Sequence, residues 1–345
     1  VQTSTVRARI ARRRWEETMN LSRRQFMYLA AAGAALPAVA RSAWAQSWPN
    51  HVIRLVVGFP PGGGADAAAR IAANRLSELW GQQVVVENRG GAGGNIAHDT
   101  VAHAAPDGYS ILFSPGSLPI MPQLFPGLSF DPMTDFMPIS TLGRYPNLVV
   151  VSKTSSMMSL KDYINKARAD PGKVTFASPG IGTTPHLAAE LLKNMAGIDI
   201  THVPYRGIAA GAMSDLLTGR IDSMFNTTGS LLEAVRSGQV RGLAASAAER
   251  SPLAPEIPTF AESGVPGFNV SSWYGLFVPA KTPRDIVTKM HDSVAAMLRE
   301  PAVKERYEVL GIETASATPE EMMAIMQSEV TLWTPIIKAA NIKGD

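Results

Sequence analysis

The sequence predicts an α/β protein in which parallel sheets are covered by helices. Short runs rich in β-branched residues alternate with alanine-rich segments along almost all of the 345 residues, and this alternation is typical of βαβ units. Glycine-rich loops join a strand to a helix at several places. About 300 residues remain after the N-terminal segment discussed below, which is enough for two compact domains.

The strands and helices of the first half of the chain are predicted from apolar periodicity and from the glycines and prolines that interrupt regular structure. The run V-I-R-L-V-V stops at Gly58 and predicts the first strand. A proline-, glycine- and methionine-rich stretch predicts irregular chain after the third strand. We expect strands at 52–57, 83–87, 110–114 and 148–151, helices at 67–79, 96–105 and 160–169, and irregular chain at 115–136.

The second half repeats the opening arrangement of strand, loop and helix. A strand is followed by a loop rich in glycine and hydroxyl groups, and then by a helix that starts near a proline. The last 60 or so residues are mainly helical by pattern. We expect strands at 174–177, 200–203, 223–225, 242–245 and 273–278, and a helix at 185–196.

The loop after the first strand reads F-P-P-G-G-G-A-D (59–66). Glycines let backbone N–H groups approach a ligand closely, and a helix N-terminus favours negative charge. The loop lacks the Lys-Ser/Thr of a nucleotide P-loop and the G-x-G-x-x-G spacing of a dinucleotide turn. It therefore favours a small organic anion such as a carboxylate, with close packing of helix on sheet as the alternative role of the glycines.

A second loop of this kind reads S-P-G-I-G-T-T-P-H (178–186). Thr184 suits an N-cap and Pro185 the first helical position. Hydroxyl and backbone N–H groups can bind a carboxylate without a cation, although a plain capped helix has the same pattern. Two such loops on separate α/β units indicate a ligand with two anionic ends, or one held between two lobes.

The N-terminus carries the pattern of an export signal. S-R-R-Q-F-M (22–27) is a twin-arginine motif, and an apolar run and A-W-A (43–45) follow it. The apolar run is shorter than the roughly 20 residues of a membrane span. We expect a signal segment over 1–45 that begins at about Met19 and is cleaved after Ala45, with the translation start at Val1 or Met19 left open. This predicts a periplasmic protein.

Removal of residues 1–45 reverses the sign of the formal net charge, which is +3 for the full sequence. These residues hold eight of the 32 basic side chains and two of the 29 acidic ones, so 24 basic and 27 acidic side chains remain and the formal charge is −3. No basic excess is left to indicate nucleic acid. The chain has no cysteine, which excludes disulfides, thiolate metal sites and thiol catalysis.

Eight motifs in order carry a family resemblance. They are F-P-P-G-G-G-A-D-A-A-A-R (59–70), V-E-N-R-G-G-A-G-G-N (86–95), A-P-D-G-Y-S (105–110), G-I-G-T-T-P-H-L (180–187), H-V-P-Y-R-G (202–207), D-L-L-T-G-R-I-D (215–222), I-P-T-F-A-E-S-G-V-P-G-F (257–268) and W-Y-G-L-F-V-P-A-K-T-P (273–283). Together they resemble the Bug family of periplasmic solute-binding proteins of tripartite tricarboxylate transporters. The resemblance implies a two-lobed fold with two crossover strands, in which each lobe is a sheet covered by helices. It places lobe one at 48–146 plus 272–345 and lobe two at 147–271.

The resemblance also implies a carboxylate site in the cleft between the lobes. Asp66 is also a simple capping residue, and His186 is equally compatible with a histidine satisfied by a neighbouring backbone group. Tyr205 either reaches the cleft or packs beneath the loop, and Asp222 has a structural alternative. Ser114, Ser117 and Asn226 are assigned because they follow strands whose carboxyl ends face a crevice. The full set is Phe59, Gly63, Gly64, Ala65, Asp66, Ser114, Ser117, Gly180, Gly182, Thr183, Thr184, His186, Tyr205, Asp222 and Asn226.

The predicted function is capture of a small carboxylate (a di- or tricarboxylate or an aromatic acid) for delivery to a membrane permease. The protein is expected to be a monomer without cofactor, metal, nucleic acid or catalytic residues. A ligand-sensing partner of a signalling system and a periplasmic hydrolase that uses Asp66 and His186 are the alternatives. The chain has no H-E-x-x-H and no G-x-S-x-G. We further expect Gly63→Val and Gly182→Val to abolish binding with the fold largely intact.

Overall fold

The computed structural model describes residues 48–205 and 211–344. The expected signal segment and its twin-arginine motif lie outside these ranges. Residues His51–Asp345 form one compact unit, to which the following description applies; of the preceding unit, Val1–Asn50, only 48–50 are described. Among the described helices, none combines the length and the apolar character that a bilayer crossing needs.

The described strands form one continuous mixed sheet. Their order is β2-β1-β3-β9-β4-β7-β5-β6, and β8 pairs with β4 off this path. The strands are β1 (Ile53–Val57), β2 (Val84–Asn88), β3 (Ser110–Pro115), β4 (Phe136–Ser152), β5 (Thr175–Ser178), β6 (Thr201–Pro204), β7 (Ser223–Thr227), β8 (Val240–Ala245) and β9 (Ser271–Pro279).

Helices cover this sheet at both ends. They are α3 (Gly64–Trp80), α4 (Asn95–Ala102), α5 (Met121–Leu124), α6 (Leu160–Ala169), α7 (Thr184–Ala196), α8 (Gly211–Leu217), α9 (Thr228–Arg236), α10 (Arg284–Met297), α11 (Pro301–Val309) and α12 (Pro319–Ala339), with 3-10 turns η1 (Ala92–Gly94) and η2 (Leu118–Ile120). The short elements η2 and α5 occupy part of the stretch that the sequence predicted to be irregular. Helix α3 begins at Gly64, three residues before its predicted start.

The predicted parallel pairing is confirmed on both sides of the sheet, whereas the strands in its middle pair antiparallel. Strand β1 pairs in parallel with β2 and β3, and β5 pairs in parallel with β6 and β7. Strands β4 and β9 run antiparallel to each other and to their other neighbours. The sequence pattern concealed most of β4 because Pro138, Gly143 and Pro146 interrupt it, and its pairing with β9 shifts register beside Pro138 and Gly143.

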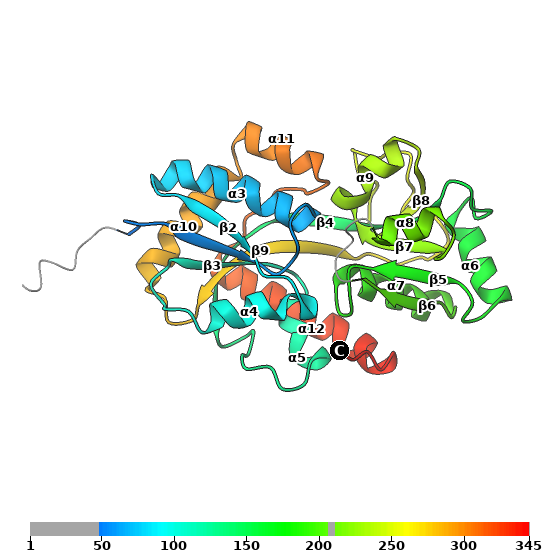
Figure 1. Cartoon of the computed structure of the whole chain (residues 1–345), viewed down its shortest axis with the longest axis horizontal. Coiled ribbons are helices and arrows are strands. Elements are labelled where there is room, and N and C mark those ends of the chain that lie inside the picture. The colour runs from blue at the N-terminus through cyan, green and yellow to red at the C-terminus, as the bar shows by residue number, and fades with distance from the viewer. Residues whose placement is uncertain (1–47, 206–210, 345) are drawn as a thin grey trace, which may run out of the picture. The chain divides into compact units, whose positions relative to one another are not determined.

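Strands β4 and β9 connect the two groups of elements and give the two-lobed α/β fold its two crossover strands. Figure 1 shows them side by side between β1–β3 on one side and β5–β8 on the other. Residues 136–146 of β4 pair with β9, whereas residues 147–152 pair with β7 and β8. One strand therefore belongs to both groups. The residue numbers of the lobe boundaries stay a prediction.

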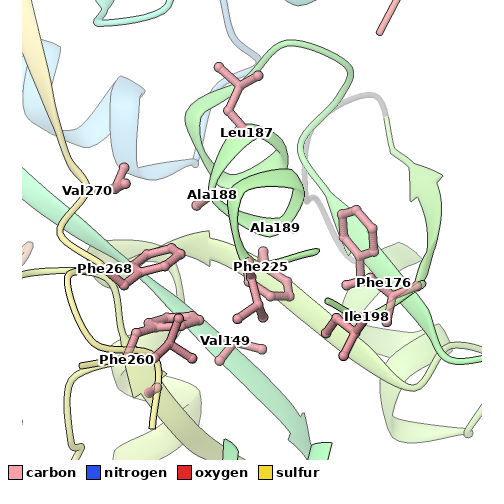
Figure 2. Packing of buried hydrophobic residues seen from close by; sticks show 14 of the residues in the cluster. Val149, Phe176, Leu187, Ala188, Ala189, Ile198, Phe225, Phe260, Phe268 and Val270 are labelled. Carbon is pink, nitrogen blue, oxygen red and sulfur yellow. The ribbon is translucent and has the colours of Figure 1, made fainter. Parts of the chain in front are cut away.

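Helix α7 is held by a buried apolar cluster, part of which is shown in Figure 2. Its face of Leu187, Ala188 and Ala189 is fully buried in this cluster, together with phenylalanines of β5 and β7. Phe260 and Phe268 stack in the same cluster with ring centroids 4.3 Å apart. Burial of each large apolar side chain contributes roughly 1.5–3 kcal/mol. The position of the α7 N-terminus is therefore fixed by packing rather than by its own first turn.

Candidate ligand-binding site

A cavity of about 500 Å³ lies at the N-terminal ends of three helices. Its size is within the range of about 300–1,000 Å³ found for small-molecule sites. No charged side chain lines it among the described residues. The lining consists of Phe59, Pro60, Pro61, Gly62, Gly63, Gly64, Ala65, Ala67, Pro115, Tyr145, Pro179, Thr183, Thr184, Pro185, Asn226, Thr227, Gly229, Ser230, Tyr274 and Leu310.

The first helix N-terminus at the cavity is that of α3, after the glycine loop that follows β1. Its N-cap is Gly63, which has no side chain to cap the first turn. The loop packs against the neighbouring glycine loop so closely that a Cβ on Gly58 would lie 2.8 Å from the Cα of Gly94. Backbone N–H groups of the first helical turn have no intrahelical partner. They are therefore available to an anion in the cavity.

Asp66 does not line the cavity, but it stabilises this loop through hydrogen bonds. Its carboxylate accepts hydrogen bonds from the Gly62 backbone N–H at 3.0 Å, from Arg70 Nε at 2.9 Å and from Asn88 Nδ2 at 2.9 Å. Burial by itself would raise the pKa of Asp66, but these hydrogen bonds outweigh it and hold the pKa below its usual value. The carboxylate is thus charged, and it ties the loop to Arg70 of α3 and to Asn88 of β2.

The second helix N-terminus at the cavity is that of α7. Its N-cap is Thr183 rather than the predicted Thr184, so the predicted start is wrong by one residue. The Thr183 side chain makes no capping hydrogen bond; its Oγ1 donates instead to the carbonyl of Gly180 at 2.7 Å. The first-turn N–H groups of α7 therefore have no side-chain cap, although a residue of the preferred capping type stands before them.

The third helix N-terminus, that of α9, was missed by sequence reasoning apart from Asn226. Its N-cap Thr227 makes no capping hydrogen bond and shares a 2.9 Å hydrogen bond with the hydroxyl of Ser230. The Oδ1 atom of Asn226 accepts from the Thr227 N–H at 2.8 Å. The run N-T-T-G-S at 226–230, between a strand and a helix, carries the same signal of glycine and hydroxyl groups as the second loop. That signal could have identified it.

The N-termini of α3 and α9 meet at one end of the cavity. A Cβ added to Gly64 would lie 3.1 Å from the Ser230 hydroxyl and 3.3 Å from that of Thr227. Figure 1 shows the first turn of α3 next to α9. Only glycine fits this approach without displacing its neighbours. Two partly positive helix ends, each equivalent to roughly half an elementary charge, are therefore brought together.

Two tyrosines of the crossover strands complete the lining. The rings of Tyr145 on β4 and Tyr274 on β9 have centroids 4.4 Å apart, and the phenol of Tyr145 lies beside Thr184. Burial raises the pKa of Tyr145 to about 12, and burial together with Tyr145 raises the pKa of Tyr274 well above its ordinary value. Both phenols are therefore protonated at neutral pH and can act as hydrogen-bond donors.

The structure brings together seven of the predicted residues and leaves eight outside the cavity lining. Those in the lining are Phe59, Gly63, Gly64, Ala65, Thr183, Thr184 and Asn226. Those outside it are Asp66, Ser114, Ser117, Gly180, Gly182, His186, Tyr205 and Asp222. The missed lining residues of most interest are Tyr145, Thr227, Gly229, Ser230 and Tyr274.

Several of the residues outside the lining have partners elsewhere. The hydroxyl of Ser114 is buried and lies 3.0 Å from His98 Nε2. The hydroxyl of Tyr205 donates to Asp215 at 2.7 Å. The carboxylate of Asp222 accepts from both the N–H and the hydroxyl of Thr175 at 2.9 Å. These contacts give each side chain a structural role.

The loop of the second helix N-terminus shows two further differences. The His186 ring is 3 % exposed, and its Nδ1 accepts the N–H of Gly182 at 3.1 Å. Gly182 has a φ of +76°, and a Cβ there would lie 2.3 Å from the side chain of Leu124. The expectation that Gly182→Val leaves the fold intact is therefore wrong, because it adds both backbone strain and a clash.

The arrangement can bind an anion through backbone dipoles and neutral donors. Three uncapped helix N-termini and two phenols face one space, and charge-assisted hydrogen bonds from such donors are short and strong. No counter-charge needs to be desolvated for this. Within residues 48–205 and 211–344, no group of His, Asp and Glu side chains is arranged to hold a metal ion.

Comparison with known proteins gives the family. Residues 68–342 match the tripartite tricarboxylate transporter family receptor. Protein BugT of Bordetella pertussis is 34% identical over 319 residues, which cover 92% of this chain and 96% of BugT.

Two solved structures of relatives show the same fold with carboxylates bound. Rpa4515 of R. palustris with adipate is 35% identical, with a TM-score of 0.81 over 86% of this chain and 99% of its own. MatC of Rhodopseudomonas palustris with bound malate is 31% identical, with a TM-score of 0.77 over 84% of this chain and 100% of its own. The chain therefore belongs to the receptor family of the tripartite tricarboxylate transporters, which includes the Bug proteins.

Proposed function

We propose that this protein captures a small dicarboxylate in the cavity between its two lobes and delivers it to the permease of a tripartite tricarboxylate-type transporter. The observation that carries the proposal is the meeting of three uncapped helix N-termini at a cavity whose described lining has no charged side chain. Relatives that bind adipate and malate support it. The chemistry is capture, with no catalytic residue and no cofactor.

Two donor groups separated by the tyrosine pair favour a ligand with two carboxylates. One group is the junction of α3 and α9 at Gly64 and Ser230; the other is the N-terminus of α7 at Thr184. The hydroxyl of Tyr274 lies 3.9 Å from the Cβ position of Gly64, and Tyr145 lies between Tyr274 and Thr184. Each donor group would hold one carboxylate, and the prolines and Phe59 would contact the carbon chain between them.

Capture would follow from ligand-driven closure of the lobes. We place lobe one at 48–146 plus 272–345 and lobe two at 147–271, with hinges at 145–149 and 270–274. On these boundaries α3 belongs to lobe one, and α7 and α9 belong to lobe two. A ligand that contacts all three helices binds the closed state better than the open state, and this difference in affinity drives closure.

The site of action that we propose is the periplasm, after twin-arginine export and cleavage following Ala45. The S-R-R-Q-F-M motif at 22–27 supports this route, as does membership of a family of periplasmic binding proteins. We propose a monomer as the capturing unit. The hydrolase alternative has little support, because Asp66 and His186 both lie outside the lining and hydrogen-bond within their own loops.

A matched pair of ligands tests this function. The mature protein is screened by thermal shift with adipate, malate and hexanoate, and the affinities are then measured by calorimetry. Saturation at 100 times Kd stabilises a protein by about 2.7 kcal/mol, so adipate should raise the melting temperature by several degrees. Hexanoate, with the same chain length and one carboxylate, should bind at least tenfold more weakly. Equal binding of the two acids, or conversion of adipate detected by chromatography, would contradict the proposal.

A further inference from the structure

A stacked pair of histidines lies beneath the loop that precedes α7. The rings of His186 on α7 and His202 on β6 have centroids 3.9 Å apart at an interplanar angle of 16°. Phe176 of β5 stacks on His202 with centroids 4.8 Å apart. His186 is buried, and neither histidine lines the cavity. The capture chemistry described above therefore makes no direct use of them.

Each histidine is tied to one end of the loop 178–182. The N–H of Gly182 donates to Nδ1 of His186 at 3.1 Å. Nε2 of His202 lies 2.7 Å from the hydroxyl of Ser178, and this hydroxyl also accepts the N–H of Gly180 at 3.2 Å. The loop is thus attached at both ends to the stacked rings, immediately before the residues that line the cavity.

The hydrogen bond from Gly182 fixes the tautomer of His186. A backbone N–H can only donate, so Nδ1 must be unprotonated and the neutral ring carries its proton on Nε2. Nε2 lies 3.8 Å from Oε1 of Glu190. A ring protonated at Nδ1 would present a donor to a donor, and the N–H of Gly182 would lose its partner.

We infer that His186 is a positioning residue for ligand capture, which holds the N–H of Gly182 away from the cavity and thereby orients Thr183 and Thr184 toward it. The inference rests on the proposed function in one respect, namely that the N-terminus of α7 binds a carboxylate. His186 acts through the loop and does not itself touch the ligand.

The surroundings keep the ring in the neutral form that this role requires. Glu190 and Lys193 face it from α7 and form a 3.0 Å ion pair with each other. His202 faces it from β6. Burial, with smaller contributions from His202 and Lys193, holds the pKa of His186 well below its usual range. Strong acidification should therefore release the loop and weaken capture.

Three variants separate this role from general packing. His186→Asn retains an acceptor close to the position of Nδ1, whereas His186→Leu removes the acceptor and keeps an apolar side chain. His103→Leu alters an exposed histidine at the C-cap of α4 and serves as the control. Circular dichroism and melting curves identify conditions under which all variants are folded.

The first measurement needs no ligand. Amide hydrogen exchange of Gly182 and the ¹⁵N spectrum of the His186 ring are recorded for the full mature protein. We expect an unprotonated Nδ1, slow exchange in the parent and in His186→Asn, and exchange at least about tenfold faster in His186→Leu. A proton on Nδ1, or equal protection of Gly182 in His186→Leu, would overturn the inference.

The second measurement uses adipate as the probe, by calorimetry. We expect His186→Leu to bind at least about tenfold more weakly than the parent, His186→Asn to be within about threefold, and His103→Leu to be unchanged. Unaltered affinity in His186→Leu despite loss of Gly182 protection would overturn the role in capture. If Gly182 behaves as expected but the parent does not bind adipate, the dicarboxylate proposal fails and the anchoring of the loop stands.

Discussion

Among the helices whose N-caps the structure describes, four begin after a serine or threonine in an extended conformation, and they do so in two ways. At α6 the hydroxyl of the N-cap Ser159 accepts the backbone N–H of Asp162 at 3.2 Å. At α12 the hydroxyl of the N-cap Thr318 accepts the backbone N–H of Glu321, also at 3.2 Å. At α7 and α9 the N-caps Thr183 and Thr227 make no such bond, and both line the cavity. The residue type at the N-cap is therefore not what decides whether a helix end is closed.

The hydrogen-bond partner of the N-cap hydroxyl decides whether the helix end is capped. The hydroxyl of Thr183 donates to a carbonyl of its own loop, and that of Thr227 pairs with Ser230. An absent cap costs a helix about 1 kcal/mol, and the apolar packing of α7 in Figure 2 offsets this. The N-termini of α7 and α9 at the site are thus left open to a ligand, whereas those of α6 and α12 are closed by their own N-cap side chains.

The largest expected effect comes from closing one open helix end. Thr183→Asp would cap α7 with its own carboxylate and place a negative charge at the cavity, so helix stability should be kept or raised. A dicarboxylate should then bind at least about 100-fold more weakly, because like charges repel in a poorly solvated site. Calorimetry with adipate measures the loss, and thermal melting measures the stability.

Thr183→Asn is the matched control for that change. It offers the same capping geometry without the charge, so its affinity should lie between those of the parent and Thr183→Asp. Parent-like binding by Thr183→Asp would show that α7 does not contact the ligand.

A second variant pair compares the two ends of α3. In Gly64→Val the side chain would fill the junction with Ser230 and should lower affinity about tenfold or more, with a loss of about 1–3 kcal/mol in the unfolding free energy from the crowded contact. In Gly81→Val the Cβ meets nothing within 4 Å, but the φ of +63° makes the backbone strained by about 1–2 kcal/mol. The second variant should therefore lose a similar amount of stability but keep its affinity, so that binding alone separates the two variants. Equal effects of the two variants on binding would contradict the α3 assignment.

The stability of the protein should also respond to acid, because a buried histidine, His98, and a half-buried one, His202, lie beneath the glycine loops. Burial lowers the pKa of His98 to about 3 and that of His202 to about 4, so the unfolded chain binds more protons than the folded one below pH about 6.5. The free energy of unfolding should therefore fall as the pH drops from 6.5 towards 4.

Carboxyl groups also titrate in this pH range, so one variant is needed to separate the contribution of His202 to the pH dependence of the unfolding free energy from theirs. His202→Asn removes one of the neutral histidines, so the pH slope of its unfolding free energy should be shallower by up to about 1.4 kcal/mol per pH unit. Urea titrations at several pH values measure the slope. Identical slopes in parent and variant would mean that His202 is not held neutral.

The smallest expected effect comes from opening a closed helix end. Thr318→Ala removes the capping box of α12 and should lower the unfolding free energy by about 1 kcal/mol, with no change in affinity for adipate. Urea denaturation and calorimetry check the two halves of this statement. A loss of affinity would show that the distinction between open and closed helix ends is not a functional one.

Sequence reasoning succeeded where local pattern and local geometry agree. The alternation of strands and helices predicted the α/β class, and the glycine loop at 59–66 predicted the α3 end of the cavity. It failed where a distant partner decides the outcome. Most of β4 was missed because antiparallel pairing with β9 outweighs the propensities of Pro138 and Gly143.

The parts of the site that depend on local sequence could be predicted, and the parts that depend on distant contacts could not. Backbone donors at helix ends follow from loop composition, so the N-termini of α3 and α7 could be identified. Whether His186 points into the cavity or under the loop depends on the rotation of one side chain and on the position of β6, which no local pattern encodes. The contribution of α9 was missed although its N-T-T-G-S run was visible.

The most direct test of the account is the amide spectrum of the ¹⁵N-labelled mature protein during titration with adipate. If open helix N-termini bind the carboxylates, the first-turn amides of α3, α7 and α9 should shift downfield together as hydrogen bonds form. The amides of Asp162 and Glu321, which the caps of α6 and α12 already occupy, should stay in place. Binding of adipate without shifts in the first-turn amides of α3, α7 and α9 would contradict the account.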